Sequence, residues 1–244
     1  AQARVTAISL ERDGSKRLEL EAGEPLFADA VIITAGGRPR KLGVAGEEEY
    51  AGRGVSYCAV CDGAFFKGAH LAVVGGGDAA LEEAVFLTRY ANEVTIIHRR
   101  DEFRAQPLLV ERAHRHGQID FAMDTQVEEI VGDGSQVRSL RLHQAGSGHD
   151  EKLEVGGVFI FIGFLPNTGL IRAHADHDTQ GYYLTDSNMM TSVPGIYAAG
   201  DVRAQLTRQV TTAVGDATTA ALAATKQVEA DRAALSPRLS AAGA

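Results

Sequence analysis

Short apolar runs alternate with polar stretches along this chain of 244 residues. Residues 70–74 read His-Leu-Ala-Val-Val and residues 94–97 read Val-Thr-Ile-Ile, which is typical of buried strands. Between them, Leu81, Ala84 and Val85 have the spacing of one apolar helix face. This order of strand, helix and strand predicts a βαβ unit within a parallel sheet.

The turn after the first predicted strand is rich in glycine and reads Gly75-Gly76-Gly77-Asp78-Ala79-Ala80. Gly75 allows a tight turn, Gly77 lets the backbone approach a pyrophosphate, and Ala80 permits close packing of helix on strand. The N-terminus of the helix then faces the phosphates. In this context the turn predicts a dinucleotide site formed by Gly75, Gly77, Asp78 and Ala80.

A basic cluster follows the second predicted strand and consists of His98, Arg99, Arg100 and Arg104. An NAD site usually places an acid here to bond the ribose 2′-hydroxyl, whereas guanidinium groups match the oxygens of a 2′-phosphate. We therefore expect NADPH as the cofactor. The alternative is a solvated surface run in which the arginines pair with Asp101 and Glu102.

Two parts of the chain resemble each other. Residues 5–20 and 30–37 read as an alternating hairpin, a buried strand and a glycine, and so do residues 137–142 and 155–163. We interpret this as an internal duplication of a nucleotide-binding domain. The expected fold is therefore α/β, with two Rossmann-like domains.

The first of these two copies is expected to be incomplete. Matching Val5 to Val137 would place the equivalent first strand and its glycine loop upstream of Ala1. The alternative is a short protein with one Rossmann unit and a β extension. Near the other end of the chain, residues 209–230 are rich in Ala and Thr and predict a helix, and disorder is expected over residues 236–244.

The chain has two cysteines, Cys58 and Cys61, which are separated by two residues and followed by Asp62. This spacing allows a short disulfide loop, and a lowered thiol pKa would make one sulfur a nucleophile. None of the eight histidines lies at zinc-finger spacing from the cysteines, and a purely structural disulfide would gain little from so small a loop. We expect a redox-active pair with Asp62 as its proton carrier, and no metal site.

Composition narrows the class of protein. Hydrophobic residues make up 45% of the chain, yet no stretch approaches the roughly 20 apolar residues of a membrane helix. The net charge of −8 argues against broad nucleic-acid binding. A CxxC pair without a visible export signal suits the reducing cytoplasm.

Four motifs occur in the order CAVCDG, GGGDAALEEA, HRRDEFRA and SVPGIYAAGDV. Together they resemble the low-molecular-weight thioredoxin reductases, and the resemblance extends over nearly the whole chain. It implies an FAD-binding domain interrupted by an NADPH-binding domain that carries the CxxC, both with ββα layers, in a homodimer. The FAD-binding parts are then residues 1–39 and 167–244, the NADPH-binding part is residues 40–166, and the N-terminal FAD-binding segment is missing.

The resemblance also implies roles for single residues. Cys61 would be the sulfur nearer the flavin, Cys58 would attack the disulfide of the partner, and Asp62 would move protons. The glycine turn would hold the pyrophosphate of NADPH and the basic cluster its adenosine phosphate. The flavin would meet residues near the C-terminus, namely Gly200, Asp201, Arg208, Gln209 and Val210.

The implied activity is the reduction of thioredoxin by NADPH through FAD and the Cys58–Cys61 pair. Two alternatives remain open at this point. One is a disulfide reductase of the same superfamily that acts on a peroxiredoxin or another protein. The other is a module that binds NADPH without catalysis.

Overall fold

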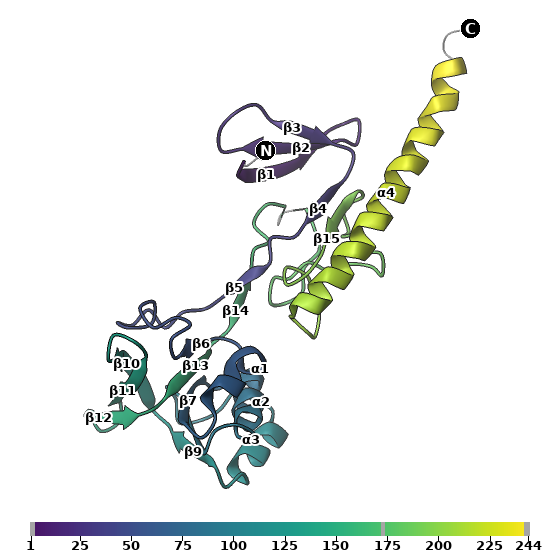
Figure 1. The fold of residues 1–244 in the computed structure, drawn as a ribbon. Coiled ribbons are helices and arrows are strands. Elements are labelled where there is room, and N and C mark those ends of the chain that lie inside the picture. Colours follow the sequence, from purple (N-terminus) through teal and green to yellow (C-terminus); the bar gives the residue numbers. More distant parts are fainter. Residues whose placement is uncertain (1–2, 172–173, 242–244) are drawn as a thin grey trace. The chain divides into compact units, whose positions relative to one another are not determined.

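The structure is a computed structural model that describes residues 3–171 and 174–241 (Figure 1). The chain divides into two compact units, of which unit 1 comprises residues 1–38 and 164–244 and unit 2 comprises residues 39–163. The chain passes between the units in β5 (Gly37–Pro39) and in β14 (Phe164–Pro166), and these two strands pair with each other. The division between the units falls after residues 38 and 163, one and three residues before the expected boundaries.

Unit 2 is built on a five-stranded parallel sheet with the strand order β6-β13-β7-β8-β9. Its strands are β6 (Val55–Ser56), β13 (Gly157–Phe161), β7 (His70–Gly75), β8 (Glu93–Ile97) and β9 (Ile119–Ala122). The predicted βαβ unit is present as β7, α2 (Asp78–Leu87) and β8. The α/β class expected from the sequence is therefore confirmed.

Both faces of this sheet are covered, because alternate residues of each strand point to opposite sides. In β7, Leu71 and Val73 belong to the core that includes α2 and α3 (Pro107–His114). Ala72 and Val74 belong to a second core beneath the antiparallel strands β10 (Thr125–Gly132), β11 (Val137–Gln144) and β12 (His149–Glu154). Unit 2 thus has the expected three layers of β meander, parallel sheet and helices. The segment that contains the two cysteines forms the short helices α1 (Ala59–Asp62) and η1 (Gly63–Phe66).

Unit 1 combines a β meander with a short parallel sheet. The meander consists of β1 (Val5–Leu10), β2 (Lys16–Leu20) and β3 (Leu26–Ala28), and the parallel pair consists of β4 (Val31–Ile33) and β15 (Ile196–Ala198). The long helix α4 (Val210–Ala241) packs on this pair, where Ala220 and Ala224 are buried with Tyr197. Alanine side chains let the helix backbone approach the sheet closely.

The internal repeat is present, but its register differs from the expected one. Each unit has a three-stranded meander followed directly by a parallel strand, so β1, β2, β3 and β4 correspond to β10, β11, β12 and β13. Val5 begins the first strand of its meander, whereas Val137 begins the second strand of its own. Matching Val5 to Val137 was therefore wrong by one strand, because β3 is only three residues long and the alternation of β10 is interrupted by a bulge.

The assigned helix α4 extends to Ala241, and the expected disorder from Ser236 onward stays a prediction. The remainder of that segment, residues 242–244, lies outside the described residues. Among the helices that the structure describes, none has the length and apolar character needed to cross a lipid bilayer.

Candidate active site

Cys58 and Cys61 form a disulfide at the start of α1, and their Cα atoms lie 5.3 Å apart. Cys58 is the N-cap residue of this helix, and the backbone N–H of Cys61 points at its sulfur over 3.1 Å. An N–H donor directed at the sulfur favours the thiolate over the thiol once the disulfide is opened. Within unit 2, Cys61 is exposed and Cys58 is half-buried.

Asp62 is fixed by a residue that sequence reasoning missed, Ser56 at the end of β6. The Ser56 hydroxyl donates to Asp62 Oδ2 over 2.6 Å and accepts from the backbone N–H of Cys58 over 3.1 Å. Ser56 is 4% exposed, so the residue at the centre of these two bonds is buried. The only sequence signal is its place in an apolar stretch two residues before Cys58.

A buried acid holds the segment that leads into the disulfide. Glu47 is 1% exposed, and its carboxylate accepts from Leu42 N, Gly43 N and the Tyr57 hydroxyl, at 3.0, 2.7 and 2.8 Å. Burial, and next the hydrogen bond to Glu47, raise the pKa of Tyr57 well above its usual value. Tyr57 therefore stays a hydrogen-bond donor, and its bond to Glu47 holds the residue next to Cys58 in place.

The glycine turn after β7 has the close packing that its sequence predicted. A Cβ atom at Gly75 would lie 2.5 Å from the Phe161 carbonyl oxygen and 2.7 Å from Ala80 Cβ. At Gly77 a Cβ atom would meet no protein atom within 4 Å. Protein packing therefore requires the glycine at position 75, whereas the space at Gly77 is open to a ligand.

The basic cluster divides into one buried and three exposed members. Arg99, Arg100 and Arg104 are exposed and form no ion pair with any described residue, so the alternative in which they pair with Asp101 and Glu102 finds no support. Free guanidinium groups beside a glycine turn are suited to phosphate oxygens.

His98 has a different environment from the arginines. Its side chain is 6% exposed, its ring stacks on Phe103 at 5.4 Å, and its Nε2 lies 3.1 Å from the Glu102 carbonyl oxygen. Burial, and further the positive charges nearby, lower the pKa of His98. The ring packs so closely on the glycine turn that a Cβ atom at Gly76 would lie 2.1 Å from it.

In unit 1, the turn at Gly200 and Asp201 follows β15 and is tied to α4. Gly200 has a φ of 77°, and its backbone N–H donates to Asp216 over 3.1 Å. Asp216 also pairs with Arg203 at 3.3 Å, and the two side chains are only 12% and 15% exposed. The shielded ion pair therefore fixes the position of the turn relative to the start of α4.

Two buried donors near the start of α4 have no hydrogen-bond partner among the described residues. They are Gln205 Nε2 and Arg208 Nε, and the Arg208 guanidinium also lies 4.1 Å above the Tyr182 ring. Buried donors are normally satisfied by protein, water or ligand, so these two are open to an acceptor outside the described residues. Of the neighbouring residues expected to meet flavin, Gln209 is half-buried and Val210 is exposed.

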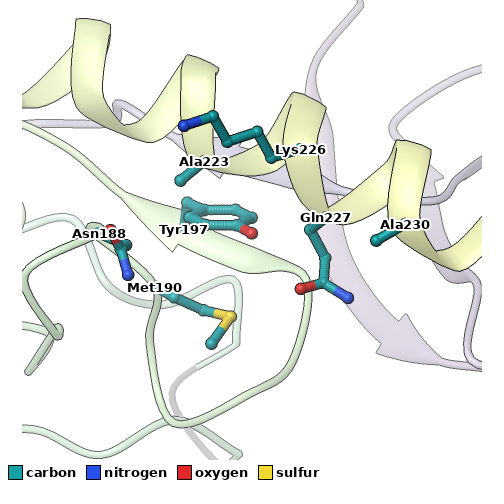
Figure 2. A pocket seen from close by; sticks show the side chains of 7 residues that line it. All are labelled: Asn188, Met190, Tyr197, Ala223, Lys226, Gln227 and Ala230. Carbon is teal, nitrogen blue, oxygen red and sulfur yellow. The ribbon is translucent and has the colours of Figure 1, made fainter.

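A hollow of about 240 Å³ lies elsewhere in unit 1, between β15 and α4 (Figure 2). Figure 2 shows the Tyr197 ring below Ala223, with Lys226 and Gln227 on the helix and Met190 on the opposite side. None of its lining residues belongs to the residues predicted to act on a cofactor. The described residues also contain no group of three side chains that could hold a metal ion.

Comparison with known proteins relates the chain to one family. Residues 2–217 match the family model described as pyridine nucleotide-disulphide oxidoreductase. A curated relative from Listeria innocua, named thioredoxin reductase, is 51% identical over 218 residues, which cover 89% of this chain and 68% of the relative. A thioredoxin reductase from Bacillus subtilis is 46% identical over 218 residues, with 89% and 69% covered.

Solved structures agree with the sequence relatives. The crystal structure of thioredoxin reductase from Streptococcus pyogenes matches with a TM-score of 0.88 and 44% identity, over 93% of this chain and 74% of that one. A thioredoxin reductase from Giardia duodenalis matches with a TM-score of 0.87 and 36% identity, over 94% and 75%. With its CxxC disulfide and its parallel sheets, the chain therefore belongs to the pyridine nucleotide-disulphide oxidoreductases and, within them, to the thioredoxin reductase family.

Proposed function

We propose that the chain is the part of an NADPH-dependent flavoprotein disulfide reductase that carries the redox-active pair, and that its protein substrate is thioredoxin. The observation that carries the proposal is the Cys58–Cys61 disulfide, with an N–H directed at one sulfur and a fixed carboxylate beside it. The names of the relatives support the choice of thioredoxin as substrate.

The surface beside the disulfide suits a protein substrate. Val60 lies between the cysteines and is 57% exposed, and Phe65 in η1 is 83% exposed. Large exposed apolar side chains next to a reactive group favour contact with another protein. A small disulfide would not need them.

The exchange itself can be written with the residues of this chain. In the dithiol form, the Cys58 thiolate attacks a sulfur of the thioredoxin disulfide and releases the other sulfur as a thiolate. The Cys61 thiolate then attacks Cys58 in the mixed disulfide, which restores the Cys58–Cys61 bond and frees a thioredoxin dithiol. Two electrons pass to thioredoxin, and Asp62 is the group placed to give and take the protons.

Two cofactors would restore the dithiol, since NADPH would supply a hydride and FAD would carry the two electrons of that hydride to the disulfide. For NADPH, the open space at Gly77 and the unpaired Arg99, Arg100 and Arg104 offer room and positive charge to the phosphates. For FAD, the unpaired donors of Gln205 and Arg208 offer hydrogen bonds to ligand oxygens. We also propose a homodimer in the cytoplasm, on the basis of the family resemblance.

The first experiment is the visible spectrum of the purified chain with and without added FAD, followed by NADPH. A stoichiometric flavin signal that NADPH bleaches, followed by reduction of thioredoxin, would support the proposal for this chain, whereas a colourless protein that binds NADPH would limit its role to the nucleotide-binding and CxxC unit. The variants Cys58→Ser and Cys61→Ser should retain NADPH binding and lose thioredoxin reduction. A chain that binds NADPH and FAD but reduces no thioredoxin, with wild-type cysteines, would refute the proposed substrate.

A further inference from the structure

The segment that follows β8, residues 98–106, is fastened to the glycine turn at both of its ends. At the first end, the His98 ring packs against Gly76. At the second end, both oxygens of Asp78 accept hydrogen bonds from Gln106, from its backbone N at 2.7 Å and from its Nε2 at 3.1 Å. Between them, the Arg104 backbone N–H donates to the Gly76 carbonyl oxygen over 2.8 Å.

The three unpaired arginines of the basic cluster lie within this fastened segment. Arg99 and Arg100 follow the His98 contact directly, and Arg104 lies two residues before Gln106. Long arginine side chains are mobile on their own, but the backbone that carries them is held at both ends. The fastening therefore sets where the guanidinium groups can reach relative to the glycine turn.

An acid in the first turn of a helix is favoured by the helix dipole, but it is unfavourable beside a bound pyrophosphate. Asp78 lies in the first turn of α2, where a pyrophosphate would bind, and a carboxylate there repels the phosphate charge. Both of its oxygens are engaged by Gln106, 28 positions away in the sequence. These bonds give Asp78 a structural role in the turn, in addition to its expected place in the dinucleotide site.

We propose that Asp78 is a specificity-determining positioning residue that holds the arginine segment against the glycine turn. This inference rests on the proposed NADPH site. NADPH would need the pyrophosphate turn and the arginines at a fixed separation, whereas NADH lacks the 2′-phosphate and would need the turn alone. Loss of the Asp78–Gln106 contact should therefore weaken NADPH much more than NADH.

The test compares the dissociation constants of NADPH and NADH for the full chain with Asp78→Ala, Asp78→Asn and Asp101→Ala. Asp78→Ala removes both bonds to Gln106. Asp78→Asn keeps them, because its Oδ1 accepts from Gln106 N and the Gln106 amide can turn its oxygen towards the new NH₂. Asp101→Ala removes the same charge from an exposed residue of the segment that has no hydrogen bond to the turn.

We expect Asp78→Ala to weaken NADPH binding about tenfold and NADH binding less than twofold, so that the preference for NADPH falls, whereas the two control variants keep the preference. A second measurement needs no cofactor. Limited trypsin digestion should cut after Arg99, Arg100 and Arg104 several times faster in Asp78→Ala than in wild type or Asp78→Asn.

Three results would overturn the inference. Equal weakening or equal strengthening of both cofactors by Asp78→Ala would mean that the residue acts on the pyrophosphate turn alone. Asp78→Asn behaving like Asp78→Ala would mean that charge matters and geometry does not. An unchanged trypsin rate would show that the segment is not held by Asp78. A wild-type chain that binds neither cofactor would instead refute the proposed NADPH site, on which the inference rests.

Discussion

At the scale of single residues, the segment that precedes the disulfide depends on the buried carboxylate of Glu47, which does not contact the cysteine sulfurs. Glu47 gathers two backbone donors and the Tyr57 hydroxyl. A buried group with satisfied hydrogen bonds costs little to keep, but deleting it leaves its donors unpaired. The residues around Cys58 are therefore sensitive to a side chain ten or more positions upstream of the pair.

We predict that Glu47→Ala lowers the free energy of unfolding by about 2–4 kcal/mol, because three donors lose their acceptor in a buried site. Urea unfolding followed by circular dichroism measures this change. Glu48→Ala is the matched control, since Glu48 is exposed and its ion pair among the described residues is with the exposed Lys41. It should change the stability by less than about 0.5 kcal/mol. Equal effects of the two variants would contradict the assigned role of Glu47.

At the scale of elements, β7, the glycine turn and α2 are packed closely against one another. Gly75 lies where the Phe161 carbonyl of β13 and the Ala80 methyl group leave no room for a side chain. Gly77, two residues later, faces open space. The two glycines of one motif thus serve different purposes.

We predict that Gly75→Ala destabilises the protein by about 1–3 kcal/mol, because the added methyl group forces β7, β13 and α2 apart. Gly77→Ala should leave stability nearly unchanged and weaken NADPH binding, because its methyl group occupies the space left for a ligand. Thermal unfolding and NADPH titration of both variants check this pair. Tight NADPH binding by a stable Gly77→Ala protein would show that the pyrophosphate binds elsewhere.

A second element, the β11–β12 hairpin, carries a pH-dependent contact. His143 Nδ1 lies 2.7 Å from Asp150 Oδ1, and this hydrogen bond raises the pKa of His143 above its ordinary value of 6.5. The contribution to stability is therefore fully present below about pH 6.5 and is lost as the pH rises through the raised value.

We predict that Asp150→Asn lowers the thermal midpoint at about pH 6 and has little effect near pH 9, where the imidazole is neutral in both proteins. Glu151→Gln, on an exposed acid of the same strand, is the control and should show no such pH dependence. A midpoint difference that is constant from pH 6 to 9 would rule out the His143–Asp150 contact as its source.

Local signals explain which elements could be predicted from the sequence. The βαβ unit could be recognised because its apolar spacing, glycines and basic residues lie within about 35 consecutive positions. β3 is too short for such a pattern and the alternation of β10 is broken by a bulge, and this led to the wrong strand register of the repeat. Ser56, Glu47 and Gln106 were missed because their roles come from contacts that only the folded chain creates.

At the scale of the whole molecule, unit 2 is a continuous stretch of chain with its own hydrophobic core on each face of its sheet. Unit 1 is discontinuous in sequence. A continuous segment whose parallel sheet is covered on both faces has what an independent domain needs.

We predict that a fragment of residues 39–163 folds alone, with a cooperative thermal transition and NADPH affinity within about threefold of the full chain. Calorimetry and cofactor titration of the fragment provide the measurement, and the same fragment with Leu71→Ala provides an unfolding control, because Leu71 is fully buried. A fragment without a cooperative transition would show that unit 2 depends on unit 1.

The pairing of β5 with β14 has a consequence for how such a protein can evolve. Because the strands that enter and leave unit 2 are hydrogen-bonded neighbours, the two ends of that segment are held close together. A segment with adjacent ends can be excised from its host, exchanged for another or inserted elsewhere without stretching the chain that remains. The paired strands therefore allow residues 39–163 to be transferred as one segment. A host protein could in this way gain or replace its disulfide chemistry in a single genetic event.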